Sequence, residues 1–151
     1  MLGPGAASSD ALAVADEVGA EIARQGAILV CGGLGGVMEA AARGAKLAGG
    51  LTVGIVPGIE AGEANAFIDV PVVTGMGEAR NVLVVRSSDA VIAIAGSYGT
   101  LSEIAVALKI RVPVVGLGTW ELRGPDGTEP PIIRAGSPRE AVAKAIEVAR
   151  S

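Results

Sequence analysis

The chain contains no histidine and only one cysteine, Cys31, among its 151 residues. A single cysteine excludes an internal disulfide bond. With no imidazole and one thiol, the composition argues against a zinc site, and we expect no bound metal ion. A Ser-His-Asp or Cys-His catalytic mechanism cannot be assembled within this chain. Aromatic residues are also scarce, so the core must be built from alanine, valine, isoleucine and leucine.

Clustered basic residues and long apolar runs are absent as well. The 12 Lys and Arg residues are outnumbered by 16 Asp and Glu, for a net charge of −4. This charge argues against a nucleic-acid surface. No apolar run approaches the roughly 20 residues of a membrane span, and the first residues do not form a signal peptide. Together with the lone cysteine, these absences predict a cytoplasmic protein without nucleic-acid or membrane partners.

Apolar runs alternate with helical patterns along the whole chain, which predicts an α/β fold with a Rossmann-like, doubly wound parallel sheet. Its length predicts a single domain over residues 1–151. We expect helices at Ser9–Gln25, Val37–Ala48, Met76–Ser87, Leu101–Lys109 and Pro138–Arg150, and strands at Ala27–Val30, Leu51–Val56, Ile68–Val73, Ala90–Ile94 and Val112–Leu117. Pro71 predicts an edge position for its strand. The Gly- and Pro-rich stretch Thr119–Ile133 predicts a loop or irregular pair.

The beginning of the chain departs from this pattern. Such folds open with a strand that enters the first glycine turn, but only Met1 and Leu2 precede Gly3-Pro4-Gly5. Two explanations stay open at this point: the strand is vestigial, or the start is truncated.

The stretch Ala90–Glu103 joins a strand, a glycine turn and a helix start. Such a turn leaves backbone N–H groups unpaired at the positive end of a helix, which attracts anions and phosphate above all. Gly96 and Gly99 let a ligand approach the backbone closely, and Ser97 and Thr100 add hydroxyl donors. Thr100 is the predicted N-cap of the following helix, and Glu103 would complete a T-x-x-E capping box.

A second unit of this kind lies upstream, where Gly32, Gly33, Gly35 and Gly36 fall within five residues after an apolar run. Parallel strands bring such turns to the same edge of a sheet. We therefore expect a phosphate-bearing ligand between the two loops. The alternative for either loop is tight packing of backbone without a ligand.

Three segments together carry a family resemblance that covers roughly residues 3–150. The segments VCGGLGGVMEAAARGAKLAGGLTVGIVPG, TGMGEARN and AIAGSYGTLSEIAVALKIRVPVVGL resemble the Lonely guy (LOG) family and its relatives, including the molybdenum-cofactor carriers. The resemblance implies a Rossmann-like subunit in dimers or larger assemblies. LOG enzymes hydrolyse the N-glycosidic bond of adenine-type nucleoside 5′-monophosphates and need no cofactor. An older label of their relatives, lysine decarboxylase, finds no support because nothing marks a Schiff-base lysine.

By this resemblance Arg80 and Glu103 match the catalytic pair of the LOG signature. Three positions depart from it: Ala95 replaces a proline, Ser97 a glycine and Asn81 a lysine. These departures favour the carrier-like branch, which binds a nucleotide or the molybdenum cofactor.

The leading hypothesis is accordingly a binder or carrier of a phosphate-bearing small molecule, and whether the chain is an enzyme stays open. The alternative is a phosphoribohydrolase, in which Arg80 orients the phosphate and Glu103 stabilises the ribosyl cation. A weaker third hypothesis, a dinucleotide-dependent enzyme, lacks a clean G-x-G-x-x-G motif. Beside Arg80, the Glu103 carboxylate is expected to stay ionised. As plainer alternatives, Arg80 is a solvated helix charge and Glu103 only a helix cap.

Apolar residues on more than one side of the helices Val37–Ala48, Met76–Ser87 and Leu101–Lys109 predict a homodimer or larger homo-oligomer, with Arg80 or Arg86 near the shared edge.

Overall fold

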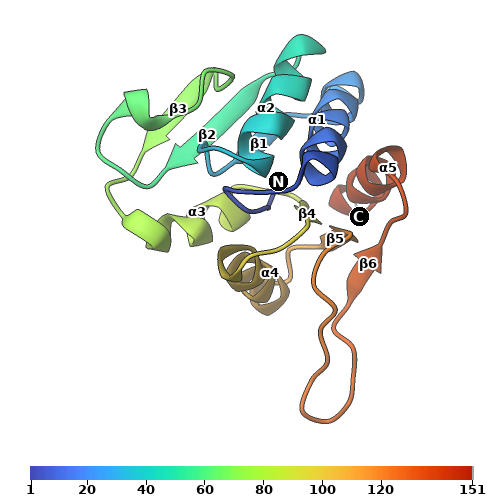
Figure 1. Cartoon of the computed structure of the whole chain (residues 1–151). Coiled ribbons are helices and arrows are strands. Elements are labelled where there is room, and N and C mark those ends of the chain that lie inside the picture. Colours follow the sequence, from blue (N-terminus) through green and yellow to red (C-terminus); the bar gives the residue numbers. More distant parts are fainter. Residues whose placement is uncertain (151) are drawn as a thin grey trace.

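A computed structural model describes residues 1–150 and confirms the α/β, Rossmann-like fold (Figure 1). Two three-stranded parallel sheets follow the orders β1-β2-β3 and β4-β5-β6. The strands are β1 (Leu29–Cys31), β2 (Thr52–Val56), β3 (Val70–Val73), β4 (Val91–Ile94), β5 (Val114–Leu117) and β6 (Ile132–Arg134). The helices are α1 (Ser9–Arg24), α2 (Val37–Leu47), α3 (Asn81–Arg86), α4 (Tyr98–Ile110) and α5 (Pro138–Ala149), with short 3-10 turns η1 (Ala61–Glu63) and η2 (Gly77–Arg80). Pro71 lies on an edge strand, as predicted.

The first two residues join the two sheets. The amino group of Met1 donates to the carbonyl of Val30 in β1 at 2.8 Å. Leu2 forms a parallel bridge with Ala93 in β4. Met1 and Leu2 therefore stand where a strand between β1 and β4 would run.

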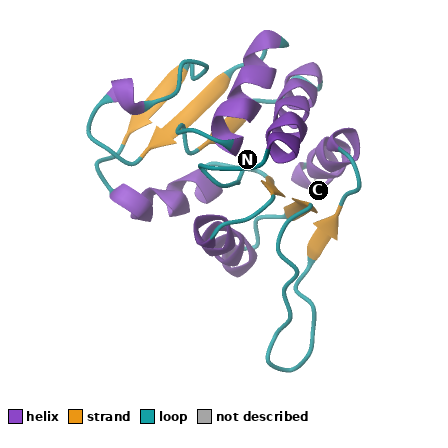
Figure 2. Ribbon diagram, in the orientation of Figure 1, coloured by secondary structure: helices purple, strands orange, loops and turns teal. Residues whose placement is uncertain are grey.

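Helices cover both faces of the sheets, as Figure 2 shows. On one face, α1, α2 and α5 pack over a buried cluster that includes Met1, Val18 and Leu29. On the other face, α3 and α4 cover a second cluster that includes Leu2 and Ile104. Because successive residues of a strand point to opposite faces, the side chains of Met1 and Leu2 pack into different clusters. The doubly wound arrangement is thus built from small aliphatic side chains, as the composition predicted.

Small residues set the distance between α1 and α2. A Cβ atom on Gly19 would collide with the backbone carbonyl of Ala41, and one on Gly44 with that of Asp16. An ion pair at 2.7 Å joins Arg43 of α2 to Asp16 of α1. The side of α2 that faces α1 is therefore used within the subunit, while Leu47 at the end of α2 stays exposed.

Some element boundaries differ from the predictions. Helix Met76–Ser87 is divided into η2 and α3. A strand, β6, starts at the end of the stretch predicted as a loop. The last helix begins after Ser137, whose side chain accepts from the N–H of Glu140, as expected of a Ser-Pro helix start. Within residues 1–150, no helix combines the length and the hydropathy needed to cross a bilayer.

Candidate functional site

At two positions, the loop after β1 adopts backbone angles that strongly favour glycine. Gly33 and Gly36 have φ of 75° and 65°. The side-chain amide of Asn65 donates to the carbonyls of Gly33 and Leu34, at 3.2 and 2.9 Å. The loop is thereby clamped from the segment after β2. Sequence reasoning missed Asn65, because nothing in its neighbourhood indicates a contact more than 30 residues away.

A third glycine segment, Gly3–Gly5, packs against this loop. The N–H of Val37 donates to the carbonyl of Pro4 at 3.0 Å. A Cβ atom on Gly36 would collide with the backbone of Pro4 and Gly5, and one on Gly3 would lie 3.1 Å from the carbonyl oxygen of Ile94. Gly3–Gly5 therefore lies between the ends of β1 and β4, where the two predicted loops were expected to share a ligand. The glycines of the segment Gly3–Gly5 are visible in the sequence, but the predicted site did not include them.

Replacing Gly36 with alanine is expected to destabilise the protein. The backbone there, with φ of 65° and ψ of −131°, costs a non-glycine residue about 1–3 kcal/mol. The collision with Pro4 adds to this cost, so the melting temperature should fall by about 4 °C or more. Thermal unfolding followed by circular dichroism measures the change.

Gly35→Ala is the matched control in the same loop. Its added Cβ would lie 3.7 Å from the nearest heavy atom, the carbonyl oxygen of Gly5. We expect it to leave the melting temperature nearly unchanged. If Gly35→Ala lowered the melting temperature as much as Gly36→Ala does, the packing described for Gly36 would be contradicted.

Arg80 is buried, so the alternative of a solvated helix charge is wrong. It ends η2, and only 7 % of its surface is exposed. Its guanidinium lies against Gly32, where an added Cβ atom would collide with Nη1. Its Nε is fully buried and has no hydrogen-bond partner within residues 1–150. A buried donor without a partner costs about 1–3 kcal/mol, more when charged, which makes this atom the strongest local sign of a missing acceptor.

Glu103 faces the interior from α4, with 7 % of its surface exposed. Burial raises its pKa to about 7, although the nearby amino group of Met1 and Arg80 act in the opposite direction. The prediction that this carboxylate stays ionised beside Arg80 is therefore wrong below neutral pH, because burial outweighs the attraction. In the described part of the chain no ion pair within 4.0 Å joins Arg80 and Glu103.

The single thiol lies beside these groups. Cys31 is fully buried at the end of β1, and its sulfur accepts from the N–H of Gly33 at 3.4 Å. Burial raises the pKa of this thiol. Cys31 thus packs as a small buried residue, and its hydrogen bond with Gly33 helps to hold the glycine loop.

The turn after β4 begins with a strained residue. Ala95 has φ of 51°, a region that non-glycine residues seldom adopt. The proline that the LOG signature has here would require φ near −65°. This departure therefore gives the turn a backbone conformation that proline cannot adopt.

The helix after this turn starts earlier than predicted. The N-cap of α4 is Ser97, without a side-chain cap hydrogen bond, and the helix begins at Tyr98. Thr100 is already inside its first turn, so the predicted capping box with Glu103 is wrong. The hydroxyls of Ser97 and Thr100 lie 3.5 Å apart. Glu103, one turn further on, is free to face the interior instead.

Two of the three aromatic residues lie at this turn. The rings of Tyr98 and Trp120 stack with centroids 6.2 Å apart and planes inclined by 30°. Trp120 Nε1 donates to the carbonyl of Ser97 at 3.2 Å, and its indole covers Gly96, where a Cβ atom would collide with it. Thr119 donates from its hydroxyl to the carbonyl of Ala95. The role of Trp120 was not predicted, because it comes from a loop without a repeating pattern.

The structure thus brings Arg80 to Gly32 and Glu103 into electrostatic range of Arg80, Cys31 and the Met1 amino group. The turn Gly96–Thr100 has other neighbours. It is held by Thr119 and Trp120, which donate hydrogen bonds to the carbonyls of Ala95 and Ser97. Glycine loops at the carboxyl ends of parallel strands, with a buried arginine beneath one of them, define a Rossmann-like domain with its candidate site at that edge.

Comparison with known proteins gives the family. The model of the SLOG cluster4 family matches residues 1–147, and the chain belongs to this family. An uncharacterized protein of Archaeoglobus fulgidus is 44 % identical over 147 residues, covering 94 % of this chain and 89 % of the relative.

Two solved structures are similar over nearly the whole chain. The molybdenum cofactor binding protein of Rippkaea orientalis has 39 % identity and a TM-score of 0.88, covering 99 % of this chain and 94 % of its own. The molybdenum cofactor carrier protein of Chlamydomonas reinhardtii has 35 % identity and a TM-score of 0.84, covering 99 % and 96 %. The expected relation to the LOG family and its carrier-like branch is confirmed.

Proposed function

We propose that this protein binds a phosphate-bearing small molecule and carries it, and that the cargo is the molybdenum cofactor. The observation that carries the proposal is the buried, unpartnered Nε of Arg80 beside Gly32. A phosphate oxygen is the natural acceptor for such a donor, because hydrogen bonds between charged groups are strong and arginine matches phosphate geometry. The carrier and cofactor-binding relatives support the choice of cargo.

The remaining predicted residues have roles in this proposal. The backbone of Gly32, Gly33, Gly35 and Gly36 approaches the phosphate from one side. Gly96, Ser97, Gly99 and Thr100 offer a second set of donors at the start of α4. The exposed Tyr98 and its neighbour Trp120 provide an aromatic surface for a flat ring such as a pterin.

The test is to purify the protein from cells that make the molybdenum cofactor and to measure bound molybdenum and pterin. We expect both at a fixed ratio to protein in the wild type, and loss of both in a variant that lacks Arg80. Protein that carries neither, while accepting a nucleotide instead, would redirect the proposal to nucleotide binding.

A second candidate, nucleoside 5′-monophosphate hydrolysis, is favoured by Glu103. A buried carboxyl with a pKa of about 7 is suited to proton transfer at neutral pH. Incubation with AMP should then release adenine and ribose 5-phosphate, and Glu103→Gln should abolish this release while AMP still binds. If the wild type releases neither product, the hydrolase candidate is wrong and only the carrier proposal remains.

We further propose a homodimer or larger assembly formed through α3 and α4. Val82 of α3 and Tyr98 of α4 are large apolar side chains with 37 % and 83 % of their surface exposed. Val82→Asp should shift the mass measured by light scattering at micromolar concentration toward the monomer, whereas Leu47→Asp, on exposed α2 surface, should not. A wild-type monomer at this concentration would refute the proposal.

A further inference from the structure

The loops that follow β2 and β3 are joined to each other at the carboxyl edge of their sheet. The N–H of Gly75 donates to the carbonyl of Gly58 at 2.7 Å, and the N–H of Gly77 donates to the carbonyl of Pro57 at 2.9 Å. These bonds hold the two loops in one fixed arrangement. We call their joint surface the β2–β3 platform, and it comprises residues 57–63 and 74–78.

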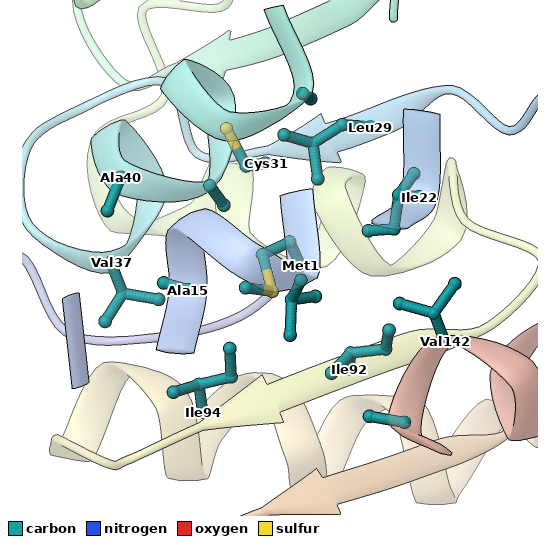
Figure 3. Packing of buried hydrophobic residues seen from close by; sticks show 14 of the residues in the cluster. Met1, Ala15, Ile22, Leu29, Cys31, Val37, Ala40, Ile92, Ile94 and Val142 are labelled. Atoms are coloured by element: carbon teal, nitrogen blue, oxygen red, sulfur yellow. The ribbon is translucent and has the colours of Figure 1, made fainter. Parts of the chain in front are cut away.

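The platform exposes two large apolar side chains. Ile59 has 79 % of its surface exposed and Met76 has 48 %. A Cβ atom on Gly75 would lie 3.4 Å from Cγ2 of Ile59, so the side chain of Ile59 reaches the other loop of the platform. Large apolar side chains elsewhere, such as those of Ile22 and Leu29 in Figure 3, are packed between helices and sheets. Exposed apolar side chains that gather on ordered loops mark an interaction surface.

Carboxylates without a paired cation lie in the same two loops. Glu60, Glu63 and Glu78 are exposed, and within residues 1–150 none of them belongs to an ion pair. The sequence has no Lys or Arg between Lys46 and Arg80. The Glu63 carboxylate accepts the N–H of Glu60 at 3.2 Å, which leaves its charge uncompensated. The platform therefore combines an apolar surface with uncompensated negative charge.

We propose that the β2–β3 platform is the docking surface for a second protein, which presents basic side chains around an apolar one and exchanges the cofactor with this chain. An apolar centre with a polar rim is the usual anatomy of such an interface. The turn η2 leads from the platform directly to Arg80, so a partner seated there stands next to the candidate site. The exchange rests on the proposed carrier function, whereas the docking follows from the platform itself.

The negative charge decides which occupant fits the platform. A two-fold contact between copies of the chain would place Glu60, Glu63 and Glu78 of one copy against the same residues of the other. Like charges that face each other across an interface oppose binding. Nucleic acids and anionic membranes would be repelled by the same carboxylates. A basic protein surface is therefore the occupant that the platform selects.

The test places the photo-crosslinking residue p-benzoylphenylalanine at position 59 of the full chain, in the organism that encodes it. The matched control carries the same residue at position 47, because Leu47 is 77 % exposed but lies at the end of α2, at the opposite edge of the sheet. We expect position 59 to form an adduct with another protein, at a surface rich in Lys and Arg, and position 47 to form none.

Binding to the purified partner then measures the role of each part of the platform. Ile59→Ser should lower the affinity by about 10-fold or more, since exposed apolar anchors carry much of the binding energy of an interface. The double variant Glu60→Gln with Glu78→Gln should lower the association rate by about 10-fold at low salt and weaken its dependence on salt. Glutamine keeps the hydrogen-bonding shape of these side chains and removes only their charge. None of these changes should alter the melting temperature or the amount of bound cofactor.

Three outcomes would overturn the proposal. If position 59 forms no adduct, or the same adducts as position 47, the platform is not a specific docking surface. An adduct of the chain with itself would identify the platform as an interface between copies. A partner whose association rate is the same for the wild type and the double variant would show that charge does not select it. Since crosslinking does not require bound cofactor, these results are independent of the test of the carrier function.

Discussion

Arg80→Met is expected to lower the affinity for the molybdenum cofactor by about 10- to 100-fold. Hydrogen bonds to charged groups contribute about 1.5–3 kcal/mol, and each 1.4 kcal/mol is a factor of ten in affinity. Methionine keeps most of the buried volume but removes the donors that lie beside Gly32. Fluorescence titration is convenient because Trp120 is the only tryptophan and lies at the Gly96–Thr100 turn.

The stability of the ligand-free protein distinguishes a role of Arg80 in ligand binding from a purely structural role. Arg80 Nε has no partner in the described residues, so its removal should leave the melting temperature of the free protein unchanged or raise it. Arg86→Met, on the exposed end of α3, is the control. It should change neither the affinity for the cofactor nor the melting temperature. A strong loss of stability in Arg80→Met with unchanged affinity would identify Arg80 as a structural residue.

Glu103→Gln is expected to become more stable than the wild type as the pH rises. The pKa of Glu103 is raised to about 7 in the folded protein from 4.5, so the folded state holds the proton more tightly than the unfolded state. The stabilisation by this proton is complete below pH 4.5 and is lost as the pH rises through 7. At about 1.4 kcal/mol for each pKa unit, the loss amounts to about 3 kcal/mol. Glutamine resembles the protonated carboxyl and does not ionise.

The measurement is urea unfolding of both proteins between pH 4.5 and 8.5. The difference in unfolding free energy should grow by about 3 kcal/mol in favour of the variant over this range. Glu78→Gln, on the exposed surface of η2, should show a flat difference. A flat difference for Glu103→Gln as well would mean that its carboxyl is not held in a desolvating environment.

The fold and the glycine loops could be predicted because their signals are local. An apolar run, a cluster of glycines and a helical pattern specify a strand, a turn and a helix within about 20 residues. Ser137 with Pro138 marked a helix start for the same reason. The start of α4 was misplaced because Ser97 and Thr100 both carry hydroxyls, and Glu103 completes a capping box only with the second.

What the sequence could not specify depends on contacts between distant segments. The burial of Arg80 requires Gly32, and the pKa of Glu103 requires Met1 and the surrounding core. Asn65 and Trp120 reach their loops from irregular stretches, where no periodicity indicates which partner they meet. Propensity and pattern carry no information on such contacts, so these residues had to be found in the structure.

A crystal structure of the protein with bound molybdenum cofactor tests the central claim most directly. We predict a phosphate oxygen within hydrogen-bond distance of the Arg80 guanidinium, with the backbone of the Gly32–Gly36 loop against the same phosphate. A cofactor bound elsewhere, without contact to this guanidinium, would contradict the account.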